Sequence, residues 1–257
     1  MGEKLREGTM SIFIITLLFA SGFLSGAVNA IAGGGTFLTF GAMTIAGIAP
    51  ISANATSSIV QFPGYVTSVI AYWPEIRSHW KSAVFLALLS IAGSIAGALM
   101  LLSLDNPEFR QLVPWLLLAA TLLFAAGPWL RPRTERERSA GNPLSLAGQF
   151  FTSIYGGFFG AGMGIMMLAV LGLTVGGAYH HLNALKNLLA VVIAAVAIVV
   201  FVSGGVVTWP AALIMIPASA LGGYSGVYIA RRVPQWIIRM LVIAVGLVLS
   251  IYYFVQT

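Results

Sequence analysis

Two groups of polar residues interrupt the apolar stretches of this chain and could together bind a small anion. The first group contains Asn54, Thr56 and Ser57, and the second contains Asn183, Lys186 and Asn187. Amide and hydroxyl groups donate hydrogen bonds, and a lysine ammonium supplies a full positive charge. A lysine within an apolar helix costs about 3 kcal/mol unless it reaches the membrane surface or finds a partner. We therefore expect Lys186 to face the anion; the alternative is that it extends to the interface.

Each polar group follows a cluster of glycines that is expected to break a helix. The clusters are Gly33, Gly34 and Gly35, followed by Thr36, and then Gly160, Gly162 and Gly164. Each glycine costs about 1 kcal/mol relative to alanine within a helix. Broken backbone at membrane depth needs protein or a wet cavity around it, and a helix that starts after the break points bare N–H groups there. Such N-termini attract anions. Both clusters are expected to line the site; a tight interfacial loop without a ligand is the alternative.

Other small and polar residues have simpler interpretations. Two glycine pairs have the four-residue spacing of close helix packing, namely Gly93, Gly97, Gly222 and Gly226. We assign these four to packing. For Gln61 and Asn187, a hydrogen bond to a neighbouring helix explains a polar side chain as well as a ligand would, and both interpretations stay open.

The composition requires lipid as the solvent for most of the chain. Of the 257 residues, 59% are apolar and 8% are charged, and the mean hydropathy is +0.95. Several apolar stretches reach the roughly 20 residues that a membrane-spanning helix needs, and strand alternation is absent. The expected fold is therefore an all-α, polytopic membrane protein. The net charge of +6 lies in the loops, which indicates membrane orientation and not nucleic-acid binding.

The distribution of reactive side chains argues against an enzyme. The seven acidic residues lie in tails or loops, and the chain has no cysteine. Carboxylates inside the membrane domain would be needed for acid–base work or metal ligation, and thiolates for nucleophilic or redox chemistry. We expect no catalytic residue, no metal and no cofactor.

The sequence superimposes on itself after a shift of 129 positions, which places Gly47 on Gly176 and Asn54 on Asn183. Self-similarity at one fixed period indicates duplication, and internal repeats in an apolar chain are typical of secondary transporters. A basic cytoplasmic linker, residues 131–143, is expected to join a first half, residues 1–130, to a second half, residues 144–257, within a single membrane domain.

The loop charges predict the orientation of the spans. Positive residues favour the cytoplasmic side, which predicts single spans at 52–72, 82–103, 110–127, 182–202, 208–230 and 236–255. A glycine-broken hairpin precedes each set of three spans and is expected to return to its starting side. Each half then crosses the membrane an odd number of times, so the halves are inverted repeats. We expect a multi-pass protein of the inner membrane.

The glycine and polar segments also carry a resemblance to a known family. At Gly33-Gly34-Gly35-Thr36 and at Ala53-Asn54-Ala55-Thr56-Ser57, the sequence resembles the TauE/SafE family of membrane transporters, and the resemblance covers nearly the whole chain. It implies transport of sulfite, of sulfonates such as sulfoacetate, or of related small anions. Members often repeat the Thr-Ser segment in the second half, where this chain has Lys186-Asn187 instead.

The expected function is movement of a small anion across the membrane by alternating access of two inverted halves. The expected site consists of Gly33, Gly34, Gly35, Thr36, Asn54, Thr56, Ser57, Gly162, Gly164, Asn183, Lys186 and Asn187. The expected partners are the anion and the lipid bilayer, and a homo-oligomer is left open. The alternatives are a passive anion channel and a membrane assembly factor that transports nothing.

Overall fold

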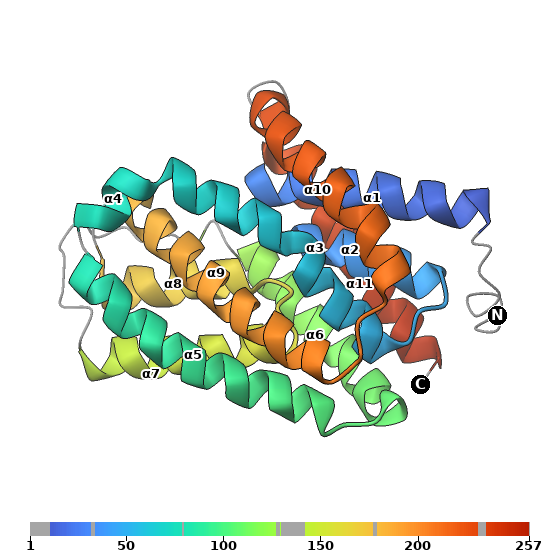
Figure 1. Ribbon diagram of the computed structural model, residues 1–257, viewed down its shortest axis with the longest axis horizontal. Helices are drawn as coiled ribbons and strands as arrows, with labels where there is room; N and C mark the ends of the chain where they lie inside the picture. The colour runs from blue at the N-terminus through green and yellow to red at the C-terminus, as the bar shows by residue number, and fades with distance from the viewer. Residues whose placement is uncertain are drawn as a thin grey trace.

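The computed structural model describes residues 11–31, 34–78, 80–126, 129, 142–176, 179–230 and 235–256. These residues form helices and their connections, which confirms the all-helical prediction (Figure 1). In chain order the helices are α1 Ile12–Ile31, α2 Gly35–Ile45, α3 Pro50–Ala71, α4 Trp73–Ser78, α5 Trp80–Leu102, α6 Asn106–Ala126, α7 Pro143–Phe158, α8 Met163–Thr174, α9 Tyr179–Ser203, α10 Trp209–Ala230 and α11 Gln235–Gln256. The expected linker falls largely on residues 130–141, which lie outside the described ranges.

The helix ends follow from local chemistry. Helix α7 begins where the Asn142 side chain accepts a hydrogen bond from the Ser145 amide, with a proline at its first position. Before α6, Asp105 and Glu108 each accept a hydrogen bond from the other's backbone amide, as in a capping box. Gly47 and Gly176 follow the ends of α2 and α8 with positive φ angles of 79° and 68°. This left-handed backbone favours glycine, which explains why these two repeat-matched positions are glycines.

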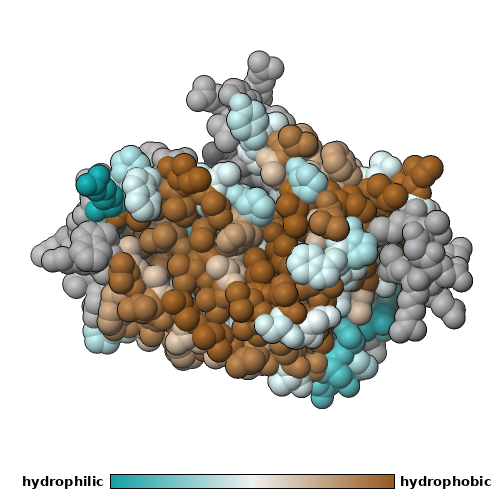
Figure 2. Space-filling model, viewed as in Figure 1, coloured by the Kyte–Doolittle hydropathy of each residue, from teal (hydrophilic) through white to brown (hydrophobic). Residues whose placement is uncertain are grey.

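The outer surface of the described part of the chain is that of a membrane protein. Four described helical segments are long and apolar enough to cross a bilayer: Ile12–Asn29, Ala83–Leu102, Asn106–Ala126 and His181–Ser203. Helices α3, α10 and α11 have 22 residues each and coincide closely with the remaining predicted spans. Large apolar side chains cover much of the face in Figure 2. Such a continuous apolar surface indicates contact with lipid.

The glycine-broken hairpins are present, and their first arms pack on distant helices. Helix α1 packs on α2 and α7 packs on α8, as the hairpin prediction requires. Helix α1 also packs on α10, which crosses it, and α7 packs on α5 (Figure 1). Two further pairs, α3 with α9 and α6 with α11, join the early and late parts of the chain. The described helices therefore form one interleaved bundle and not two separate ones.

Close helix approach explains the paired glycines. A Cβ added at Gly97 would meet the backbone carbonyl of Ile154 on α7, and one added at Gly222 would meet that of Phe23 on α1. Gly93 also lies against the α7 backbone. These contacts confirm the packing assignment for three of the four glycines, whereas nothing is described around Gly226.

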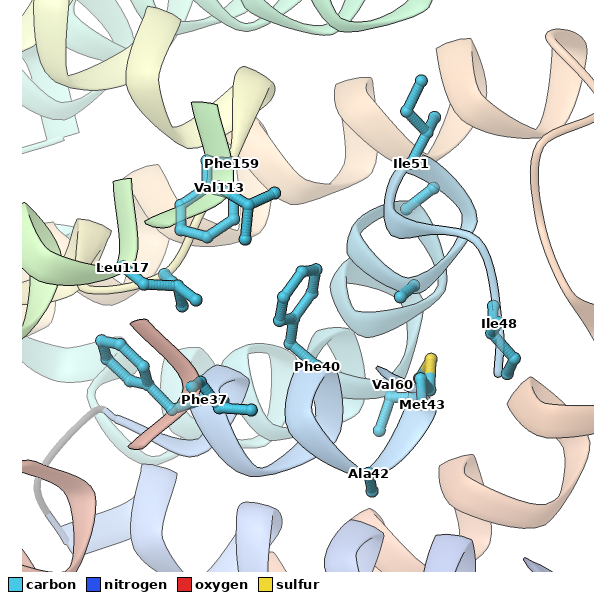
Figure 3. Close-up of a cluster of buried hydrophobic side chains, with 14 of the residues drawn as sticks. Phe37, Phe40, Ala42, Met43, Ile48, Ile51, Val60, Val113, Leu117 and Phe159 are labelled. Carbon is cyan, nitrogen blue, oxygen red and sulfur yellow. The ribbon is translucent and has the colours of Figure 1, made fainter. Parts of the chain in front are cut away.

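A buried aromatic cluster joins α2 and α6 to the second break. Phe40 of α2 points toward Phe159, which follows α7, and their ring centroids are 5.8 Å apart (Figure 3). Phe109 of α6 contacts both Phe158 and Phe159. The second arm of the first hairpin therefore packs directly against the break of the second hairpin.

Candidate functional site

The first break lies between α1 and α2, where Gly34 and Gly35 are buried. The Ser25 hydroxyl of α1 donates a hydrogen bond of 2.8 Å to the Gly35 carbonyl, and a Cβ added at Gly35 would meet the backbone of Ser25. No side chain caps the start of α2. Thr36 is buried in the first turn of α2, and Gly33 lies outside the described residues. This break is therefore a tight backbone contact next to an uncapped helix N-terminus.

The second break covers residues 159–162, between α7 and α8. Gly160 and Gly162 both have φ angles of 74°, in the left-handed region that favours glycine. Gly162 is the N-cap of α8 and provides no side-chain hydrogen bond. Gly164, which we expected in the break, lies inside the first turn of α8. The backbone N–H groups of that turn therefore have no side-chain cap.

A tyrosine holds the second break in shape. The Tyr155 hydroxyl of α7 donates a hydrogen bond of 2.6 Å to the Ala161 carbonyl. Replacing Tyr155 with phenylalanine leaves that carbonyl without its partner, and an unsatisfied buried group costs about 1–3 kcal/mol. We expect Tyr155→Phe to lower the midpoint of thermal unfolding of the purified protein. Tyr252→Phe, on an exposed position of α11, is the control; an equal loss in both variants would show that Tyr155 does not support the break.

Helix α3 connects the two breaks along one face. The Asn54 side-chain amide donates a hydrogen bond of 2.8 Å to the carbonyl of Phe158, the last residue of α7. Two helical turns further on, the Gln61 side-chain amide donates to the Ser25 hydroxyl, which in turn bonds to Gly35. Ser57 lies between Asn54 and Gln61 on this face and is fully buried. The polar face of α3 therefore extends from the second break to the first.

Lys186 lies beside the start of α8. A Cβ added at Gly164 would be 3.7 Å from the Cδ atom of Lys186. Neither α8 nor α9 contains an acidic residue. The ammonium and the uncapped N-terminus of α8 both contribute positive potential, so this corner of the molecule suits an anion. Among the described residues, no cluster of three or more His, Asp or Glu residues could hold a metal ion.

The remaining predicted residues have separate surroundings. Thr56 accepts a hydrogen bond of 3.0 Å from the Thr208 amide, just before α10. Asn183 donates one of 3.1 Å to the Tyr72 hydroxyl at the end of α3, so the repeat-matched Asn54 and Asn183 have different partners. Asn187 is buried on α9. The structure thus brings Asn54, Ser57, Gly162, Gly164 and Lys186 to the helices around the second break, and places Gly34, Gly35 and Thr36 at the first.

Two residues of these networks were not predicted, namely Ser25 and Tyr155. Both lie in apolar helical segments that contain other hydroxyl groups, so neither side chain stands out in the sequence. Their hydrogen-bond partners are backbone carbonyls at the breaks, so only the three-dimensional structure identifies their roles.

Known proteins match this chain over nearly its whole length. The family model described as "Sulfite exporter TauE/SafE" matches residues 18–253. The chain is 27% identical over 248 residues to "Probable membrane transporter protein" of Haemophilus influenzae, covering 94% of each chain. It is 27% identical over 248 residues to "Probable membrane transporter protein YfcA" of Escherichia coli K12, covering 94% of this chain and 90% of the relative. For "Probable membrane transporter protein ORF9" of Sinorhizobium sp., the identity is 28% over 249 residues, covering 94% and 93%. These matches include both glycine breaks.

Proposed function

The chain belongs to the Sulfite exporter TauE/SafE family of membrane transporters, which are not enzymes, and from this premise we propose that it is a permease for a small anion. The anion binds near the second break and crosses the inner membrane as the two halves alternate access. The family and its curated relatives support transport; the choice of an anion rests on the residues around the break.

The observation that carries the choice of an anion is the position of Lys186 beside Gly164. The side chain of Lys186 lies against the first turn of α8, whose amides have no side-chain cap. A helix N-terminus with a nearby ammonium provides net positive potential, which suits the oxygen atoms of a small anion. Gly164 has no side chain, so an anion can approach both the helix and the lysine. Sulfite or a sulfonate fits this chemistry, because each presents several anionic oxygens.

Matched contacts between helices of the two halves support the proposed mechanism. The contact of α1 with α10 corresponds, under the 129-residue register, to the contact of α7 with α5. In the same way, the contact of α3 with α10 corresponds to that of α9 with α5. Matched contacts of this kind are expected from two repeats related by a two-fold axis. We propose that residues 1–130 and 144–257 are inverted repeats that rock about the interface between them.

The test of this function is an anion screen followed by transport. Sulfite, sulfoacetate and other small anions, added as choline salts, are tested for their effect on thermal unfolding of the purified protein. At least one is expected to raise the midpoint saturably, because a ligand that binds the folded state stabilises it. The same anion is then expected to enter proteoliposomes that contain the protein.

Two outcomes separate permease from its alternatives. If no anion changes the midpoint and none is transported, the anion permease is wrong, and a stable co-purifying protein would favour an assembly factor. If the anion crosses but neither an ion nor a pH gradient drives its accumulation, the protein is a passive channel. Accumulation above equilibrium supports the permease.

A further inference from the structure

Three side chains on one face of α3 have buried polar atoms without a partner. Asn54, Ser57 and Gln61 are spaced by three and four residues, and their exposed fractions are 1%, 0% and 2%. The atoms without a hydrogen bond are Asn54 Oδ1, Ser57 Oγ and Gln61 Oε1. A buried polar atom left unpaired costs about 1–3 kcal/mol. Three such atoms along one helix face therefore indicate a ligand that the face is built to receive.

The chemistry of these atoms favours a cation. The Nδ2 atom of Asn54 already donates to the Phe158 carbonyl, and the Nε2 atom of Gln61 donates to the Ser25 hydroxyl. What remains unpaired on both amides is the carbonyl oxygen, which accepts hydrogen bonds and binds cations but repels anions. A serine hydroxyl oxygen also ligates hard cations, which prefer oxygen donors. This face is therefore complementary in charge to the surroundings of Lys186.

The polar face of α3 lies beside the C-terminal end of α7. Asn54 contacts the carbonyl of Phe158, where α7 ends. The last carbonyls of a helix lack partners within it, and the C-terminal ends of broken helices in transporters coordinate cations. Asn54 and Gln61 are seven residues apart, or about 10 Å along the helix axis, so one ion cannot reach both amide oxygens. Ser57 lies within one turn of each and is the ligand common to either arrangement.

We propose that Ser57, together with the amide oxygen of either Asn54 or Gln61, binds a monovalent alkali cation such as Na+ between the two glycine breaks. The helices that pack most closely on α3, namely α1, α2, α9 and α10, contain no acidic residue that could carry a proton instead. Helix α6 also contacts α3, and its one acidic residue, Glu108, accepts a hydrogen bond from the Asp105 amide at the start of that helix. The cation occupies the repeat position that Lys186 holds in the second half. Its use as the coupling ion rests on the proposed anion transport, whereas its binding does not.

Thermal unfolding in different chloride salts tests the cation site directly. The purified protein is compared in NaCl, KCl and choline chloride at one ionic strength, without any candidate substrate. We expect a saturable rise of the midpoint in NaCl or KCl relative to choline chloride, and saturable binding of 22Na+ that unlabelled Na+ displaces. Equal midpoints in all three salts together with no displaceable 22Na+ binding would overturn the proposal.

Variants assign the effect to α3. Ser57→Ala removes a buried oxygen that has no partner, so the variant is expected to fold and to be at least as stable as the parent in choline chloride. It is expected to lose the cation-dependent rise. Gln149→Leu is the matched control, because Gln149 on α7 is also buried with an unpaired Oε1 but bonds to Ser90 and Ser153 and not to either break. A full cation effect in Ser57→Ala would overturn the assignment.

The anion screen keeps this inference separate from the proposed function. A cation effect without any anion effect would leave the cation site standing and the anion permease refuted. An anion effect without a cation effect would refute the cation site alone. If both sites are real, a saturating concentration of Na+ is expected to strengthen the apparent anion affinity, since binding effects between two sites are reciprocal.

Discussion

Replacing Gly222 with alanine is expected to separate α1 from α10 and to lower the thermal stability of the protein, whereas Gly223→Ala is expected to be tolerated. A Cβ at Gly222 would overlap the backbone carbonyl of Phe23, but the nearest atom to a Cβ at Gly223 is the Gly26 carbonyl, 3.9 Å away. The two glycines are neighbours in sequence and in the same helix. Intrinsic helix propensity is therefore matched between the two variants.

The size of the effect follows from which atoms are displaced. A backbone carbonyl cannot rotate away as a side chain can, so the helices must move apart along their whole contact. Overpacking typically costs about 1–3 kcal/mol, and we expect Gly222→Ala to reach the upper end, because the opposite residue Gly26 is equally close to the Ser219 backbone. This corresponds to a fall of roughly 6–12 °C in the midpoint of thermal unfolding.

Both variants are purified in the same detergent, and each is measured by size-exclusion chromatography and, separately, by thermal unfolding. Gly223→Ala should elute as a single peak with a midpoint close to the parent. Equal behaviour of the two variants would mean that α1 and α10 do not approach as closely as described.

The second large effect is expected at Lys186. Replacing Lys186 with methionine keeps the aliphatic part that lies against Gly164 and removes the ammonium. A hydrogen bond to a charged group contributes about 1.5–3 kcal/mol, and each 1.4 kcal/mol is a factor of ten in affinity. We expect the affinity for the transported anion to fall by roughly 10- to 100-fold, with uptake into proteoliposomes reduced accordingly.

Folding and net charge are controlled separately. Lys186→Met should not lower the midpoint of thermal unfolding in the absence of anion, because an apolar side chain replaces a charge inside a helix bundle in lipid. Arg77→Met removes one positive charge from an exposed position on α4 and should leave uptake unchanged. Unaltered anion affinity in Lys186→Met would remove Lys186 from the site and would favour a lysine that extends to the membrane surface.

The helices and their breaks could be predicted because they depend on local composition. The interruptions near Gly34 and Gly162 lie where the sequence places clustered glycines, although Gly222 and Gly223 continue α10 without a break. The exact limit of the second break could not be predicted. Gly164 continues α8 because two left-handed glycines, Gly160 and Gly162, already complete the turn.

Contacts between distant helices could not be predicted, since no periodicity encodes them. The sequence register matches Asn54 with Asn183, but one donates to a backbone carbonyl on α7 and the other to the hydroxyl of Tyr72. The unpaired oxygens of Asn54 and Gln61 are likewise invisible in the sequence, because an amide has both donors and acceptors. Only the partners of its nitrogen atom reveal which side remains for a ligand.

The pairing of α1 with α10 also sets a schedule for biosynthesis. Helix α1 is the first of the described helices to be synthesised, and α10 begins about 180 residues after α1 ends. At about 5–20 residues per second, the ribosome needs roughly 10–40 s to supply that partner. During this interval the glycines of α1 that will contact α10 face lipid or another protein. The bundle can therefore close only after nearly the whole chain has entered the membrane.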